Sequence, residues 1–291
     1  MIPPENVVAP VYALAFTPCG QRLLIGMAHT LRVWDLASGA TLLVRAVLGR
    51  GEAVHGIELA ADRLLIFGVR EACVLRFTHG ADWCTVEPAI ACLRFPRRVL
   101  SMLLYEAAGG GGGGQPPWQL AIGFDDNTVA TSQHAMGGGD AASAVPAAGT
   151  VVGCSEAPLL YAMALWHQRT PASAAGGRTL AVAGSAFRTV LLWDATPPPL
   201  PPAAGASSRA AVLTRPPLRR LEGHQGAVFR VRFSPSGEWV ASVSDDRRVI
   251  VWRVPPGQAA MEGVGGAATE AADAAEESTI VQGGVASWFA H

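Results

Sequence analysis

Residues 221–254 read LEGHQGAVFRVRFSPSGEWVASVSDDRRVIVWRV, and this stretch decides the fold. Residues 228–233 alternate two sets of side chains, which is the period of a half-buried strand. A Ser-Pro-Ser-Gly turn at 234–237 leads to a strand of small residues at 240–244, and an Asp-Asp turn leads to a closing strand at 249–252. Three strands joined by tight turns predict an antiparallel meander.

The same stretch resembles a WD repeat, the sequence unit of a four-stranded β-propeller blade. Gly223 precedes His224, and Trp252 follows that histidine by 28 residues. The resemblance implies a structural tetrad in which hydrogen bonds link His224, Ser242, Asp246 and Trp252. Buried polar groups are tolerated only when all are paired. We therefore expect a structural role for these residues rather than a catalytic one, because no exposed nucleophile turn accompanies them.

Weaker copies of the unit precede it, at residues 10–36, 53–77, 98–132 and 159–195. We expect two of them to close with a Trp-Asp pair, at Trp34-Asp35 and Trp193-Asp194, and the second to close with Phe77 in place of the tryptophan. The predicted fold is an all-β WD-repeat propeller over residues 1–254. Its five recognisable units are expected at 8–45, 46–80, 97–135, 155–196 and 218–254.

Three inserts interrupt the units, at residues 107–117, 136–150 and 197–217. Their glycine-, alanine- and proline-rich composition lacks an apolar pattern, so we expect disordered loops. Residues 255–291 are expected to form an Ala/Gly/Glu-rich linker that ends, at Phe289-Ala290-His291, on the start of a further repeat. Five blades would leave open sheet edges, and we therefore expect an incomplete ring from a longer protein of several propellers, or a truncated gene model.

Composition narrows the classes of function. The 291 residues carry a formal net charge of −1, and all 22 basic residues are arginine. This balance lacks the strong basic stripe that is typical of phosphate-binding domains. The chain begins without a secretory signal pattern, and five cysteines without C-x-x-C spacing favour neither a disulfide framework nor a zinc cluster. We expect a reducing, cytoplasmic setting, no metal and no cofactor.

The ordered series of repeats resembles the beginning of the WD-repeat protein 6 family. The resemblance rests on PVYALAF with LRVWDLASG, then Val54-His55-Gly56-Ile57 with LLIFGVREACVLRF, then LAIGFDDNTV and TLAVAGSAFRTVLLWDA, and it spans about residues 8–254. Members of that family are non-catalytic partners of a tRNA 2′-O-ribose methyltransferase that modifies the wobble nucleotide of the anticodon. The resemblance implies a scaffold that positions tRNA for a partner enzyme, which itself uses S-adenosylmethionine.

Candidate contacts to such a partner or to tRNA fall in two groups. Arginines suit phosphate oxygens, and A-form RNA is recognised mainly through its shape and backbone. The arginine candidates are Arg97, Arg98, Arg219, Arg220, Arg247 and Arg248. The second group stands where strands enter or leave loops at one end of the propeller: His55, Gly56, Gln225, Phe229 and Asp245. For each of these, a solvated surface residue or a packed residue is the structural alternative.

Two other classes of function stay open at this point. One is a general protein-interaction scaffold, for example a substrate receptor of a ubiquitin ligase. The Trp-Asp-x-Arg signature of one receptor class is absent, since Asp35 is followed by Leu36-Ala37 and Asp194 by Ala195-Thr196. The other is an enzyme, but the chain carries no G-x-S-x-G elbow, P-loop, H-E-x-x-H or dinucleotide fingerprint. We therefore expect no catalysis by this chain.

Overall fold

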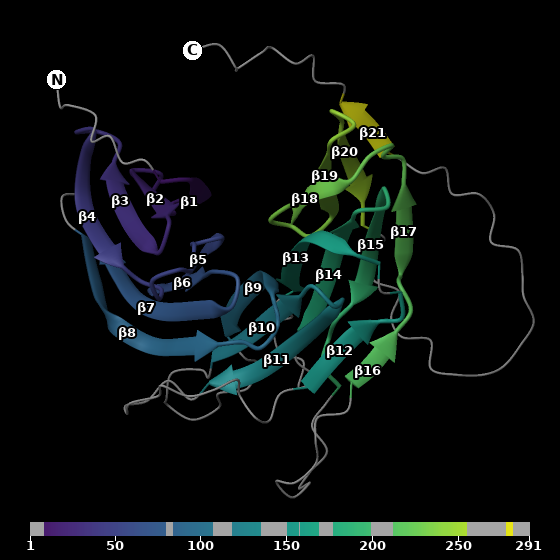
Figure 1. The fold of residues 1–291 in the computed structure, drawn as a ribbon, viewed down its shortest axis with the longest axis horizontal. Helices are drawn as coiled ribbons and strands as arrows, with labels where there is room; N and C mark the ends of the chain where they lie inside the picture. Colours follow the sequence, from purple (N-terminus) through teal and green to yellow (C-terminus); the bar gives the residue numbers. More distant parts are fainter. Residues whose placement is uncertain are drawn as a thin grey trace, which may run out of the picture.

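The computed structural model describes residues 9–79, 84–106, 118–134, 150–156, 158–168, 177–198, 212–254 and 278–281. These residues form five β-sheets arranged as the successive blades of a propeller around a common centre (Figure 1). The all-β propeller predicted from the repeats is confirmed. Within these described ranges, no helix has the length and apolarity that a membrane span requires.

Each blade is an antiparallel sheet whose strands follow the chain from the centre outward, apart from one added edge strand. Blade 1 comprises β1 (Val11–Phe16), β2 (Arg22–Met27), β3 (Thr30–Asp35) and β4 (Ala40–Ala46). Blade 2 comprises β5 (Gly56–Ala60), β6 (Arg63–Phe67), β7 (Glu71–His79) and β8 (Cys84–Arg94). Blade 3 comprises β9 (Val99–Glu106), β10 (Trp118–Phe124), β11 (Thr128–His134), β12 (Thr150–Cys154) and the edge strand β16 (Val212–Arg215).

The last two blades complete the series. Blade 4 comprises β13 (Leu160–Gln168), β14 (Arg178–Ser185), β15 (Thr189–Asp194) and β17 (Arg219–Glu222). Blade 5 comprises β18 (Val228–Phe233), β19 (Trp239–Ser244), β20 (Val249–Arg253) and β21 (Ser278–Val281). The four strands that each blade takes in chain order alternate in direction, so the chain leaves a blade at the end where it entered. Every inner strand therefore begins at the same end of the propeller, which we call the top face. The second-to-third-strand turns and the entries to inner strands lie there, and the other connections leave at the opposite end.

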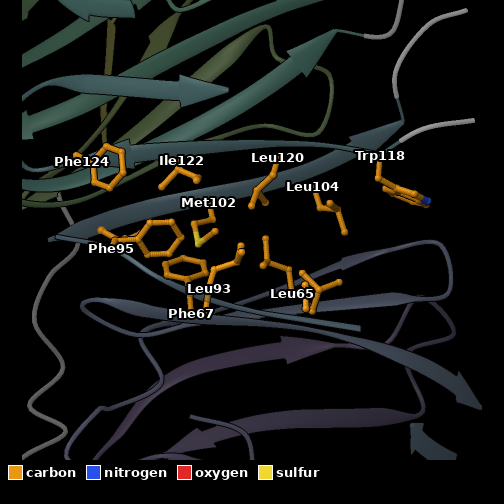
Figure 2. Close-up of a cluster of buried hydrophobic side chains, with 14 residues drawn as sticks. Leu65, Phe67, Leu93, Phe95, Met102, Leu104, Trp118, Leu120, Ile122 and Phe124 are labelled. Carbon is orange, nitrogen blue, oxygen red and sulfur yellow. The ribbon is translucent and has the colours of Figure 1, made fainter. Parts of the chain in front are cut away.

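Alternation along the strands explains how the blades pack. Each blade has one face toward the preceding blade and one toward the next, and four apolar clusters fill the four junctions in turn. Figure 2 shows the cluster between blades 2 and 3, where Phe67 and Leu93 meet Met102, Ile122 and Phe124. Each cluster therefore joins two neighbouring blades and no more.

Glycine at one position of the second strand lets the next blade approach closely. A Cβ at Gly26 would lie 2.5 Å from Val54 Cγ1, and a Cβ at Gly184 would lie 2.6 Å from Val228 Cγ1. Both valines stand at the start of the following inner strand. Blade packing thus requires a residue without a side chain at these two positions.

The outward faces of the first and last blades lack such a partner among the residues described. Leu14 and Phe16 of β1 occupy positions that face the preceding blade elsewhere, and they are 61% and 62% exposed. Arg230 and Arg232 of β18 occupy positions that face the next blade elsewhere, and both are exposed. The two ends of the arc therefore differ in chemistry, one apolar and the other basic.

Two predicted segment assignments need correction. The insert 197–217 was expected to be a disordered loop, but residues 212–215 form β16, which pairs in parallel with β12. Residues 255–291 were expected to be an Ala/Gly/Glu-rich linker, but residues 278–281 form β21, which pairs with β20. Parallel or long-range pairing satisfies backbone groups of a segment whose local sequence carries no hairpin signal. The insert 107–117, residues 136–149 and Phe289-Ala290-His291 lie outside the described residues.

The fifth repeat unit and its blade are offset by one strand. Residues 219–222 open the fifth sequence unit, yet they form β17, the outer strand of blade 4. The second unit was expected to end near residue 80, but blade 2 continues through β8 to Arg94. Its closing residue was also misplaced. Trp252 pairs with Val240, and the equivalent pair in blade 2 is Leu75 with Leu64, so Phe77 lies two residues beyond the expected position.

Candidate functional site

The four side chains of the expected tetrad meet at the junction of blades 4 and 5. His224 lies in the entry to β18, Ser242 on β19, Asp246 in the turn after β19 and Trp252 on β20. His224 Nδ1 is 2.9 Å from Asp246 Oδ2, His224 Nε2 is 2.8 Å from Ser242 Oγ, and Trp252 Nε1 donates to Ser242 Oγ over 2.8 Å. The His224 and Ser242 side chains are buried.

Asp246 anchors the entry loop through the backbone as well. Its carboxylate accepts from the N–H of Gln225 at 2.8 Å and from the N–H of Arg248 at 2.9 Å. Burial alone would raise the pKa of Asp246, but these hydrogen bonds and the one from His224 together hold it below its usual value. Because every group of this network is paired and Ser242 is fully buried, the arrangement is a structural brace.

A second constellation lies on the top face, where each inner strand begins. The registers skip one residue of β1, β9, β13 and β18 at a β-bulge, namely Tyr12, Leu100, Tyr161 and Phe229. His55 stands at the corresponding position of blade 2, immediately before Gly56. A bulge re-aims the extra side chain away from the sheet. We call these five residues the mouth ring: Tyr12, His55, Leu100, Tyr161 and Phe229.

The mouth ring presents aromatic surface to solvent. Tyr12, Tyr161 and Phe229 are 46%, 43% and 48% exposed. Tyr12 stacks on His55 with 5.0 Å between ring centroids, and Tyr161 stacks on Phe229 at 5.6 Å. Each stacked pair joins two neighbouring blades. The inner strands lie side by side in chain order, so the ring follows the inner edge of the arc.

Positive charge surrounds this ring. Burial lowers the pKa of His55, and Arg98 and Arg230 lower it further, while Glu52 opposes them. Arg98 precedes β9 and Arg230 belongs to β18, so side chains of blades 3 and 5 both act on a histidine of blade 2. Further along the inner strand of blade 2, burial raises the pKa of Glu58 on β5, and Arg232 on β18 counteracts that effect.

The predicted contacts divide between this face and internal roles. Gly56 is required by packing, since a Cβ there would overlap the Phe67 ring. Arg97 pairs with Asp126, donates to Thr128 Oγ1 at 2.8 Å and lies 4.0 Å from the centre of the Phe124 ring. Gln225 and Asp245 are exposed on the top face, as are Arg98 and Arg247.

The outer-strand arginines are placed differently. Arg219 and Arg220 lie on β17, at the outer edge of blade 4. Arg220 Nε donates to both carboxylate oxygens of Glu156 at 2.8 Å. Of Arg248, the structure shows a backbone N–H bound to Asp246. The predicted arginines therefore do not form one continuous stripe.

The closing residues of blades 1 and 4 also have structural partners. Asp35 accepts from the N–H of Ser38 at 2.8 Å and from its hydroxyl at 2.6 Å. Asp194 pairs with Arg178 at 3.0 Å and with Arg215 of β16 at 2.9 Å. Trp34 is 37% exposed on the uncovered face of blade 1. Trp193 is fully buried, and its Nε1 finds no acceptor among the described residues.

Sequence reasoning included His55 and Phe229 but missed the other ring members. A signal was present, because the five inner strands begin Val-Tyr-Ala, Val-His-Gly, Val-Leu-Ser, Leu-Tyr-Ala and Val-Phe-Arg. Only the register identifies the middle residue as a bulge. In the part of the chain that is described, no group of three histidine, cysteine or carboxylate side chains is arranged to hold a metal ion.

Comparison with known proteins agrees with this geometry. The model of the family "WD domain, G-beta repeat" matches residues 7–35 and 215–253. The chain is a β-propeller that carries WD40 repeats. The solved WD40 β-propeller domain of Doa1 superposes with a TM-score of 0.50 at 13% identity, covering 83% of this chain and 64% of that one.

Two curated relatives match a shorter part of this WD40-repeat chain. A Notchless protein homolog from Arabidopsis thaliana is 35% identical over 77 residues, which is 26% of this chain and 13% of the relative. Protein HIR1 from Mycosarcoma maydis is 36% identical over 76 residues, which is 26% of this chain and 7% of the relative. The chain therefore spans a small part of either relative. A WD40 propeller fold favours a platform for protein partners, and the site rather than the fold determines what is bound.

Proposed function

We propose that this propeller is a cytoplasmic, non-catalytic accessory subunit that holds a tRNA 2′-O-ribose methyltransferase in position for the anticodon wobble nucleotide. The identity of the partner rests on the resemblance of the ordered repeats to the WD-repeat protein 6 family. The platform role is supported by the mouth ring, because monomeric proteins rarely leave clustered aromatic side chains in solvent without a binding role. That ring is the observation on which the proposal depends.

Contact with the enzyme, rather than with tRNA phosphates, is the arrangement that the arginines favour. Arg97 and Arg220 are already neutralised by Asp126 and Glu156. Arg219 lies on an outer strand, away from the inner edge where the mouth ring lies. Recognition of an RNA backbone needs several unpaired cations along one surface, and of the predicted arginines Arg98 and Arg247 are the two exposed on the top face. We therefore propose that tRNA is positioned through the partner protein.

Affinity purification of the tagged chain from its own cells tests the proposal, together with quantification of wobble ribose methylation after depletion. We expect a ribose methyltransferase among the recovered proteins and loss of the wobble modification, restored by the wild-type chain. A Phe229→Ala variant should fail to restore it, and Phe187→Ala, an exposed aromatic outside the mouth ring, should succeed. Recovery of unrelated complexes with the modification intact would instead favour a general scaffold, such as a ubiquitin-ligase substrate receptor.

A further inference from the structure

Two of the four cysteine side chains that the structure describes lie together in blade 2. Cys73 of β7 is the direct register partner of Cys92 of β8, and their Sγ atoms are 3.9 Å apart. Cys73 is buried, whereas Cys92 is exposed. We propose that this pair is a reversible redox site, in which hydrogen peroxide converts the two thiols into a disulfide that fastens the outer strand β8 to β7. The site needs no partner macromolecule, so it goes beyond the proposed function.

Strand pairing already holds the two side chains close to the arrangement that a disulfide needs. Directly opposed residues of antiparallel strands have Cβ atoms about 4.5–5.5 Å apart, and a disulfide needs about 3.5–4.5 Å. The register shifts between Val74 and Leu75, immediately beside the pair, which loosens the ladder at this point. Because β8 is the outer strand of its sheet, it can move toward β7 without displacing a further strand.

Charged groups of two blades flank the pair. Residues two apart share a face of a strand, so the ion pair of Glu71 with Arg94, at 3.1 Å, stands beside the thiols and joins β7 to β8. Arg45 of β4 reaches across from blade 1 and donates to the carbonyl oxygens of Val86 and Glu87 on β8, to the latter over 3.0 Å. Reactive cysteines are found in such partly exposed, electropositive surroundings.

The two thiols differ in what they can do. Burial and the neighbouring thiol of Cys92 raise the pKa of Cys73, and Arg45 opposes them. The Cys73 thiol therefore stays protonated at neutral pH, away from solvent. Cys92 is the thiol that an oxidant in solvent reaches, and Cys73 is placed to attack its sulfur afterwards.

The reaction has two steps. The Cys92 thiolate attacks one oxygen of hydrogen peroxide, so that an S–O bond forms, the O–O bond breaks and the leaving hydroxide takes up a proton to become water. The sulfur of Cys73 then attacks the sulfur of the Cys92 sulfenic acid. The S–S bond forms, the S–O bond breaks, and the leaving hydroxide takes the Cys73 thiol proton as a second water. Two thiols and one peroxide thus give one disulfide and two waters, and a thiol reductant reverses the change.

Peptide mapping after oxidation tests this site. The full chain is treated with hydrogen peroxide, unfolded with N-ethylmaleimide present to block free thiols, and cut with trypsin, which places Cys73 in residues 71–76 and Cys92 in residues 77–94. We expect these two peptides to be joined by a disulfide that dithiothreitol removes. The link should be absent from Cys73→Ala and Cys92→Ser. Because Cys84 shares the second peptide, Cys84→Ser should retain the link.

Cys19 provides the matched control. It is exposed, its neighbour is the Thr17 hydroxyl at 3.2 Å, and hydrogen bonding by that hydroxyl lowers the pKa of the Cys19 thiol. Peroxide should therefore leave a sulfenic acid on Cys19 that dimedone traps in the wild-type chain. Dimedone should label Cys92 about tenfold more in Cys73→Ala than in the wild type, because the attacking thiol is then missing.

Several results would overturn the redox site. One is that peroxide gives no linked peptides although dimedone labels Cys19. A link from Cys73 to Cys84, or a link between two copies of the chain on a non-reducing gel, would do the same. So would equal labelling of Cys92 with and without Cys73. Cys92→Ser changes an exposed residue, so loss of the link in that variant does not depend on how well the Cys73 variant folds.

Discussion

His224 and Asp246 are 22 positions apart in the chain, yet Nδ1 of one lies 2.9 Å from Oδ2 of the other. Their contact fastens the loop that enters blade 5 to the turn between its second and third strands. The histidine ring also reaches Ser242, on which the Trp252 indole converges. The blade is therefore braced by polar contacts across the top of its apolar interface with blade 4.

Removing either end of this brace should destabilise blade 5. We expect His224→Ala or Asp246→Ala to lower the free energy of unfolding by about 1–3 kcal/mol, because each leaves a buried polar partner unpaired. Arg247→Ala, an exposed neighbour in the same turn, should cost less than about 0.5 kcal/mol. Urea denaturation measures all three. Equal losses would show that the network contributes nothing beyond an ordinary surface turn.

Blade 4 offers the converse experiment. Ala183 occupies the register position that Ser242 has in blade 5, and the buried Trp193 Nε1 lacks an acceptor among described residues. Ala183→Ser should supply that acceptor and raise the free energy of unfolding by about 0.5–1.5 kcal/mol. Ala164→Ser, which buries a hydroxyl on the opposite face of the blade, should lower it. Thermal melting distinguishes the two, and destabilisation by both would reject the correspondence between the blades.

Close approach at the blade junctions predicts a sharp difference between two glycines. A Cβ at Gly184 would lie 2.6 Å from Val228 Cγ1 and 3.0 Å from its carbonyl oxygen, so Gly184→Ala should cost about 1–3 kcal/mol. At Gly153 the nearest atom would be 3.4 Å away, an ordinary contact. Gly153→Ala should therefore leave the melting temperature unchanged or raise it. If the two variants melt together, the junction between blades 4 and 5 is looser than this geometry requires.

Acid should weaken the contact between β15 and β16. Burial would raise the pKa of Asp194, but hydrogen bonds from Thr196 and Arg178 hold it below the ordinary 3.8. A folded-state pKa below the unfolded value stabilises at neutral pH, and that contribution is lost as pH falls through the folded-state value. Asp194→Asn should thus be less stable than wild type at pH 7, with the gap narrowing toward pH 3 in denaturant titrations. A gap that stays constant would exclude ionisation of Asp194 as its source.

How far the sequence predicts this molecule depends on how local each signal is. The meander around Trp252 could be predicted because its turns and tetrad residues lie within one short stretch. Strand β16 could not, since it pairs in parallel with β12, far away in the chain, and its own four residues carry no turn signal. The placement of Phe77 failed because the pairing of strands, which a sequence copy does not show, makes Leu75 the equivalent of Trp252.

In the candidate site, too, local signals could be predicted and features that depend on strand pairing could not. Phe229 and His55 were singled out from their place near loops, whereas Tyr12 and Tyr161 look like ordinary strand residues. Their exposure depends on β-bulges. A bulge can be seen in the pairing of the strands, but not in the alternation of polar and apolar residues along the sequence. Trp193 and Trp252 close their repeats alike in sequence, yet only Trp252 has a serine within reach. Whether a buried group is paired depends on the neighbouring strand rather than on the motif.

The separation of connections between the two ends of the propeller has an evolutionary consequence. The joins from β9 to β10, β11 to β12 and β13 to β14 all leave the sheets at the end away from the mouth ring. These joins carry the long glycine- and alanine-rich insertions, while the top face keeps short turns and entries. Changes in the length of these joins therefore start from strand ends on one side of the molecule, and the strand ends that carry the mouth ring stand on the other.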